Sequence, residues 1–124
     1  LIFKVLSKKY KTLATSGNFN NHIGVPLTLL SITKDIEFAV VEMGANHQGE
    51  IAELCEIAQP DMGLITNIGN AHLGGFGSIE NLINTKLALF DAVKSKSNIF
   101  LLNSNDDILI ERIKNYDNIF SYGK

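Results

Sequence analysis

Short apolar stretches alternate along this chain with segments in which apolar residues recur at helical spacing. The apolar stretches end in turn residues, which is typical of buried strands. On this pattern we predict strands over residues 11–15, 36–43, 61–68, 99–102 and 119–122. Helices are predicted over residues 26–33, 49–58, 78–93 and 106–114, and the chain starts inside a further helical pattern.

This alternation predicts βαβ units, and therefore an α/β fold with a mostly parallel sheet of about five strands and flanking helices. Local signals support the helix boundaries, because Ser78 is a suitable N-cap residue and Pro60 prevents the helix over residues 49–58 from continuing. Cys55 lies on the apolar face of that helix, so we interpret it as a core residue and not as a nucleophile.

Composition narrows the class of protein. The 124 residues are 45% apolar and 19% charged, enough for one ordinary core and too apolar for a disordered chain. A formal net charge of -2 gives no electrostatic reason to expect nucleic acid or an anionic membrane as a partner. A single cysteine excludes an internal disulfide framework and fits a cytoplasmic location. The absence of an apolar run of about 18 residues argues against a membrane span.

Two residues follow predicted strands in a way that indicates a ligand site. Glu42 ends the strand over residues 36–43, and His72 lies in the glycine-rich loop after the strand over residues 61–68. In an open α/β sheet both side chains are expected near the carboxyl edge, where ligands bind. A carboxylate and an imidazole suit a divalent metal. The alternative for Glu42 is a strand-end carboxylate that forms a salt bridge or caps the next helix.

Lys86 is out of place on its helix. At about 100° per residue it falls among Ile79, Ile83, Phe90 and Val93, which lie within about 40° of one direction. Burial of an unpaired ammonium costs several kcal/mol, so the side chain must reach solvent, find an anion or lose its charge. The first outcome is a surface lysine, and the others indicate a functional lysine whose pKa falls on burial.

A loop over residues 16–24 carries Asn18, Asn20 and Asn21. These side chains either hydrogen-bond the turn backbone or form a polar cradle for a ligand. No role for His22 or His47 follows from spacing alone.

Four ordered segments resemble the Mur ligase family: TSGNFNNHIGVPLTLL, VVEMGANHQGEI, LITNIGNAHLGGFGS and NTKLALF. The resemblance extends over about residues 1–103. It implies that residues 1–124 are part of the central, P-loop NTPase-like, ATP-binding domain of a three-domain enzyme of peptidoglycan synthesis. Such an enzyme uses ATP and Mg²⁺ to add D-alanyl-D-alanine to UDP-N-acetylmuramoyl-tripeptide through an acyl phosphate.

The resemblance also implies roles for individual residues. Glu42 would bind the magnesium that bridges the ATP phosphates, His72 would hold a second magnesium, and Lys86 would support that metal as a carbamate. Asn67 would lie beside the nucleotide. The residues implied to meet the UDP-sugar substrate are Asn18, Asn20 and Asn21, with Asn46 and His47 as neighbours.

The chain departs from the family pattern in several places. The phosphate-binding motif GxxxxGKS or GxxxxGKT is absent, and Gly74 stands where relatives often have an acidic residue. The adenine-binding segment and the C-terminal domain are missing as well. We therefore expect a fragment that is inactive by itself.

Two other functions compete with this interpretation. One is a different amide ligase of the same superfamily, of the folylpolyglutamate or cyanophycin synthetase type, and the NNHIG and EMGANH segments argue against it. The other is a non-catalytic nucleotide-sugar-binding module.

Overall fold

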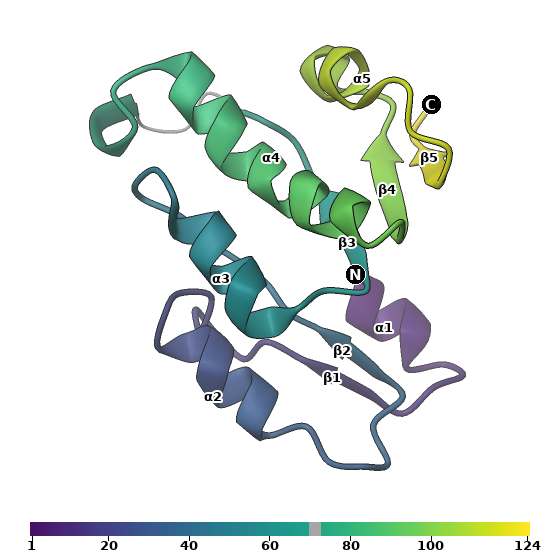
Figure 1. Cartoon of the computed structure of the whole chain (residues 1–124). Coiled ribbons are helices and arrows are strands. Elements are labelled where there is room, and N and C mark those ends of the chain that lie inside the picture. The colour runs from purple at the N-terminus through teal and green to yellow at the C-terminus, as the bar shows by residue number, and fades with distance from the viewer. Residues whose placement is uncertain (70–72) are drawn as a thin grey trace. The chain divides into compact units, whose positions relative to one another are not determined.

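The computed structural model describes residues 1–69 and 73–124 (Figure 1). They form two compact units, Leu1–Gly44 and Ala45–Lys124. Helices and strands alternate in both units, and every strand pair is parallel. The predicted α/β class with parallel strands is confirmed, although the five strands pair as a two-stranded and a three-stranded sheet.

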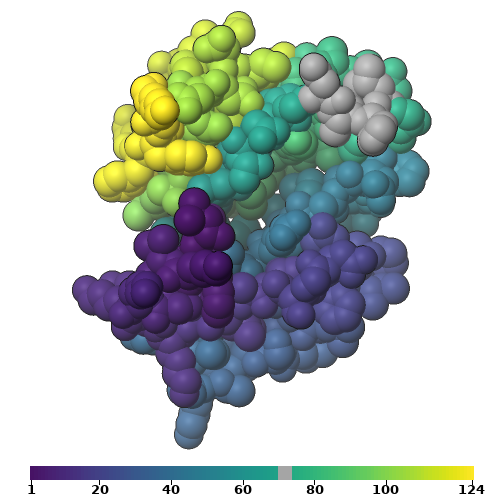
Figure 2. Space-filling view, turned by 180° about the vertical axis from the view of Figure 1, so that it is seen from behind, coloured from purple at the N-terminus to yellow at the C-terminus, as the bar shows by residue number. Residues whose placement is uncertain are grey.

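The first unit contains a two-stranded parallel sheet and two short helices. Its elements in chain order are α1 (Ile2–Leu6), β1 (Thr12–Ala14), α2 (Gly24–Leu30) and β2 (Phe38–Val40). Strand β1 pairs with β2 in a register that places Thr12 opposite Phe38. Among residues 1–44, Val25 is the one large apolar side chain that is fully buried, and α1 and α2 keep much apolar surface exposed. Figure 2 shows α1 at the surface, in dark purple.

The second unit contains a three-stranded parallel sheet in the order β3-β4-β5. Its elements are α3 (Glu50–Ala58), β3 (Met62–Ile65), the 3-10 helix η1 (Leu73–Gly75), α4 (Ile79–Ser95), β4 (Ile99–Asn103), α5 (Asp107–Ile113) and β5 (Ile119–Tyr122). Helix α4 packs against α3 and against β3 and β4, whereas α5 packs against β4. Strand β5 lies at the sheet edge and is coloured yellow in Figure 2. Its Phe120 side chain is exposed.

Side-chain caps fix the helix starts of this unit. The Ser78 hydroxyl accepts a hydrogen bond from the Asn81 N–H, as its N-cap position predicts. Asp106 caps α5 in the same way, because its Oδ1 accepts from the Leu109 N–H. Helix α3 ends at Ala58, and its C-cap residue Gln59 is left-handed with φ of 48° and lies just before Pro60.

The core of the second unit lies between α4, α5 and the inner face of the sheet. Phe100 of β4 is fully buried, and its ring meets the Phe90 ring edge-on, with centroids 5.1 Å apart. The other fully or nearly fully buried members are Ile65, Ile68, Ile83, Val93, Leu102, Leu109 and Ile113. Burial of Ile83, Phe90 and Val93 confirms the predicted apolar face of α4, but Ile79 is 43% exposed because it lies in the first turn, beyond this core.

The first three strands are shorter than the sequence pattern predicted, whereas α4 continues to Ser95 and β4 to Asn103. Strand β2 stops at Val40 and β3 stops at Ile65, so Glu42 and Asn67 each lie two residues beyond a strand. The apolar residues after each strand pack as loop residues, and Ile68 is fully buried without being in a strand. Helix α2 begins at Gly24, earlier than predicted, and ends at Leu30.

In the described parts of the chain, no helix has the length and apolar character needed to cross a membrane.

Gly63 of β3 tests how tightly the second core is packed. A Cβ atom at this position would lie 2.9 Å from Phe100 Cε2 and 2.9 Å from Val93 Cγ2. We expect Gly63→Ala to lower the free energy of unfolding by about 1–3 kcal/mol, because these buried side chains must leave their rotamer minima. Urea unfolding measures this change. In Gly74→Ala, the control, the new Cβ meets no described atom within 4 Å. Equal stability of the two variants would contradict the packing described here.

Candidate functional site

The carboxyl end of β3 continues into a short irregular segment, Thr66, Asn67 and Ile68, which we call the turn after β3. Lys86 of α4 reaches this turn. Lys86 Nζ donates to the Asn67 carbonyl at 2.9 Å and to the Ile68 carbonyl at 2.5 Å. The two carbonyls therefore form a cation-binding corner at the sheet edge where open α/β proteins bind ligands. The structure thus brings together Lys86 and the backbone of Asn67, two residues that the sequence had singled out separately.

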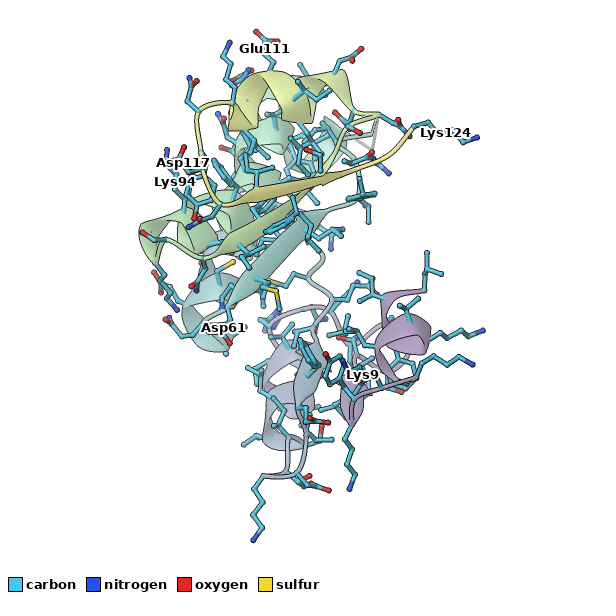
Figure 3. All side chains as sticks on the ribbon, turned by 90° about the vertical axis from the view of Figure 1, so that its right-hand side faces the viewer. Lys9, Asp61, Lys94, Glu111, Asp117 and Lys124 are labelled. Carbon is cyan, nitrogen blue, oxygen red and sulfur yellow. The ribbon has the colours of Figure 1, made fainter. Side chains whose placement is uncertain are left out.

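The structure shows how the charge of Lys86 is accommodated on the apolar face of α4. The side chain is partly buried, and its ammonium reaches backbone carbonyls instead of projecting freely into solvent. Burial lowers the pKa of Lys86 below its ordinary value, whereas the Asp106 carboxylate acts in the opposite direction. A larger share of neutral amine makes this lysine a better nucleophile than an exposed one. Lys94, further along α4, is exposed by comparison (Figure 3).

Two further side chains hold the same turn, and the sequence did not single them out as site residues. Asp106 Oδ2 accepts a hydrogen bond of 2.8 Å from the Ile68 N–H. Asn103 Nδ2 donates to the Thr66 carbonyl at 2.7 Å. Asn103 is the last residue of β4 and Asp106 lies just beyond it, so both are placed by the strand next to β3 in the sheet. The sequence signal was the polar run Asn103–Asp107 directly after a buried strand, of which only Asp106 had been assigned a role, as the first residue of a predicted helix.

Glu42 lies in the first unit, just beyond β2, and its carboxylate is exposed. Its backbone N–H donates to Thr15 Oγ1 at 2.8 Å, which ties the end of β2 to the residue after β1. Asn20 Nδ2 lies 3.4 Å from Glu42 Oε1, and the Asn20 carbonyl accepts from the Gly44 N–H at 2.8 Å. Gly44 lies so close to Asn20 that a Cβ would approach Nδ2 to 2.8 Å. The structure therefore joins Asn20 and Glu42 in one local arrangement.

Asn21 and Asn18, in the loop over residues 16–24, have different hydrogen-bond partners from Asn20. Asn21 Oδ1 accepts from the Ile23 N–H at 3.1 Å and from the Gly24 N–H at 2.9 Å, so its carbonyl oxygen caps the start of α2. This corresponds to the turn-stabilising alternative considered for the loop. The Asn18 side chain is exposed, and its backbone carbonyl accepts from the Asn20 N–H at 2.8 Å.

Asn46 and His47 belong to the second unit and share the carboxylate of Glu50, a residue to which the sequence alone assigned no role. Glu50 Oε2 accepts from the Asn46 N–H at 2.6 Å and from the His47 N–H at 2.9 Å. These two bonds hold the pKa of Glu50 below its ordinary value, and the bond from the His47 N–H has the larger effect. His47 Nδ1 lies 3.5 Å from Glu50 Oε1. On the other side, Gly75 passes so close to the Asn46 carbonyl that no Cβ would fit.

Not every residue singled out from the sequence is placed. His72 lies outside the described residues, and Glu42 and Lys86 belong to different units. Within residues 1–69 and 73–124, no three His, Cys, Asp or Glu side chains gather closely enough to hold a metal ion. Cys55 is buried, and burial raises the pKa of its thiol to about 11, so it stays protonated and fits the expected core role.

Known proteins resemble this chain in sequence. The profile of the Mur ligase middle domain matches residues 1–124. A relative from Escherichia coli K12, UDP-N-acetylmuramoyl-tripeptide--D-alanyl-D-alanine ligase, is 42% identical over 105 residues, which are 85% of this chain and 23% of that protein. The protein of the same name from Bacillus subtilis 168 is 45% identical over 94 residues, 76% of this chain and 21% of that protein.

Solved structures agree with these sequence matches. MurF from Acinetobacter baumannii superimposes with a TM-score of 0.85 at 38% identity, over 96% of this chain and 26% of that one. MurF ligase from Thermotoga maritima in complex with ADP gives a TM-score of 0.86 at 35% identity, over 99% of this chain and 29% of that one. The chain spans about a quarter of the length of the curated relatives it matches. Matched along its whole length by the middle-domain profile, the chain belongs to the Mur ligase family.

Proposed function

We propose that this chain is the ATP-binding middle part of a cytoplasmic ligase that adds D-alanyl-D-alanine to UDP-N-acetylmuramoyl-tripeptide. The names of the relatives from Escherichia coli and Bacillus subtilis support this substrate pair. The ADP complex of the Thermotoga maritima protein supports a nucleotide site. The observation that carries the proposal is the position of Lys86, whose amine lies against the carboxyl end of a parallel strand instead of in solvent.

In this proposal Lys86 works as a carbamate. The neutral Nζ attacks the carbon of carbon dioxide, a C–N bond forms, and the nitrogen releases one proton to water. The product is a carbamate anion, which removes the cost of a partly buried positive charge and supplies oxygen ligands suited to Mg²⁺. The lowered pKa of Lys86 favours this step, because only the neutral amine is nucleophilic.

The donor set fits magnesium in chemical type. Glu42 offers an exposed carboxylate at the end of a strand, with Asn20 beside it. Carboxylate oxygens are preferred Mg²⁺ ligands. We assign Glu42 to the metal at the ATP phosphates, and His72 together with carbamylated Lys86 to a second metal. Mg²⁺ would offset negative charge on the phosphates and on the reacting acyl group.

The loop residues bind and orient substrate in this proposal. Asn18 and Asn20 meet the UDP-sugar, whereas Asn21 shapes the loop by capping α2. Asn46 and His47 are further contacts, and their backbone is fixed by Glu50. Asn67 lies beside the nucleotide. The tripeptide carboxylate takes the terminal phosphoryl group of ATP with release of ADP, and the D-alanyl-D-alanine amine then displaces phosphate and loses a proton to give the amide.

Replacement of Lys86 by arginine separates a metal-supporting lysine from a merely structural one. Arginine keeps the positive charge and hydrogen-bond donors for the Asn67 and Ile68 carbonyls, but it forms no carbamate. We expect Lys86→Arg in the full-length ligase to lower kcat by about 100-fold or more. A steady-state assay of phosphate release measures this loss. Lys94→Arg, on an exposed position of the same helix, is the control. Near-normal turnover of Lys86→Arg would overturn the carbamate assignment.

Glu42 is tested by removing its charge while keeping its shape. We expect Glu42→Gln to reduce ATP-dependent amide formation by about 100-fold, because a neutral amide is a poor substitute for an anionic magnesium ligand. Since the side chain is exposed, unfolding stability should change by less than about 0.5 kcal/mol. Glu37→Gln makes the same charge change just before β2 and should leave the rate unaltered. A Glu42→Gln enzyme with normal Mg²⁺ dependence would mean that the metal is held elsewhere.

Substitution of Glu50 tests whether the Asn46–His47 segment contacts the substrate. One oxygen, Oε2, accepts both backbone N–H groups, so glutamine at this position retains a carbonyl acceptor whereas alanine does not. We expect Glu50→Ala to raise the KM for the UDP-tripeptide about 10-fold, the equivalent of one net hydrogen bond. Glu50→Gln should stay closer to the wild-type value. If both variants bind substrate normally, the Asn46–His47 segment does not contact it.

A further inference from the structure

One peptide group links Lys86 to Asp106. The Asn67 carbonyl, which accepts from Lys86 Nζ, and the Ile68 N–H, which donates to Asp106 Oδ2, belong to the same peptide unit. A peptide unit is planar and rotates as one body. A bond that holds the N–H end therefore sets the direction of the carbonyl at the other end.

The two oxygens of the Asp106 carboxylate accept hydrogen bonds from two different parts of the chain. Oδ1 caps α5 through the Leu109 N–H at 3.0 Å, and Oδ2 holds the Ile68 N–H at 2.8 Å. Helix capping alone would be satisfied by serine or asparagine. The two N–H groups are met by two different carboxylate oxygens, and asparagine would place an NH₂ donor at one of these two positions, so only one of the N–H groups keeps its bond. The second oxygen is thus explained by the turn and not by the helix.

The side chains around the turn support the same conclusion. Ile68 is fully buried in the core, which leaves its N–H dependent on a protein acceptor. Asn103 fixes the preceding Thr66 carbonyl at 2.7 Å, so the turn is held on both sides of the Asn67 carbonyl. The turn's own sequence contributes none of these bonds. Its conformation is imposed by side chains from β4 and from the start of α5.

We propose that Asp106 is a positioning residue for Lys86, acting through the Asn67–Ile68 peptide plane. This inference rests on the proposed role of Lys86 as a carbamate. By holding the Ile68 N–H, Asp106 fixes the direction of the Asn67 carbonyl that accepts from Lys86 Nζ. It therefore fixes the position of the amine at which the carbamate forms. In this proposal Asp106 acts through the peptide plane alone, without contact to substrate or metal.

The test uses full-length ligase supplied with ¹³C-labelled bicarbonate. The ¹³C signal of the Lys86 carbamate is followed against bicarbonate concentration in wild type, Asp106→Asn and Asp106→Ser. Both replacements still cap α5 and lose the second acceptor. We expect each to need about 10-fold to 100-fold more bicarbonate for half-maximal signal, as is usual when a partner of a metal ligand is removed. Activity should recover at high bicarbonate, which a purely structural defect would not allow.

Asp107→Asn is the matched control. It removes the same charge one residue later, from an exposed side chain that, among the described residues, makes no hydrogen bond or ion pair to the turn. Its bicarbonate dependence should equal that of wild type. If Asp106→Asn and Asp106→Ser fold and respond to bicarbonate like wild type, the positioning role is wrong and the carbamate assignment stands. If wild type itself shows no Lys86 carbamate, the proposed role of Lys86 is wrong and this inference falls with it.

Discussion

The second unit depends on how the chain leaves β3. A strand that ends in a buried position leaves backbone N–H and C=O groups that water does not reach, and each needs a partner. Here the partners are side chains: Asn103 at the Thr66 carbonyl, Asp106 at the Ile68 N–H, and Lys86 at the next two carbonyls. Three elements, α4, β4 and α5, therefore meet at one turn. The bonds that complete the fold at this edge are also those that place the lysine of the proposed site.

Elements were predictable from the sequence to the extent that local signals determine them. Ser78 caps α4 as predicted, because capping depends on residues within one helical turn. The length of β3 was overestimated, because the apolar residue Ile68 beyond it packs in the core from a loop and not from a strand. Hydrophobic periodicity reports burial, and it does not distinguish a buried strand residue from a buried turn residue.

The candidate site was predictable in part for the same reason. Lys86 was visible because a lysine on an apolar helical face conflicts with its surroundings. Its partners were not visible, because backbone carbonyls carry no sequence signature. The bond from the Ile68 N–H to Asp106 was not predictable, because helix capping alone already explains an aspartate at that position without any long-range contact. Asn21 shows the reverse case: it was considered for ligand binding, and its carbonyl oxygen is used by the start of α2.

The corner that receives Lys86 favours a cation, which bears on how a carbamate would fit there. Two carbonyl oxygens attract an ammonium and repel the two anionic oxygens of a carbamate. A carbamylated lysine retains one N–H, so it keeps one hydrogen bond to the turn and directs its oxygens away from both carbonyls. In the proposed mechanism the same corner would serve both forms, holding the amine before reaction and orienting the carbamate afterwards. A turn with a freely rotating Asn67–Ile68 peptide would lose this direction, so the fixed N–H of Ile68 would matter for the proposed chemistry at Lys86.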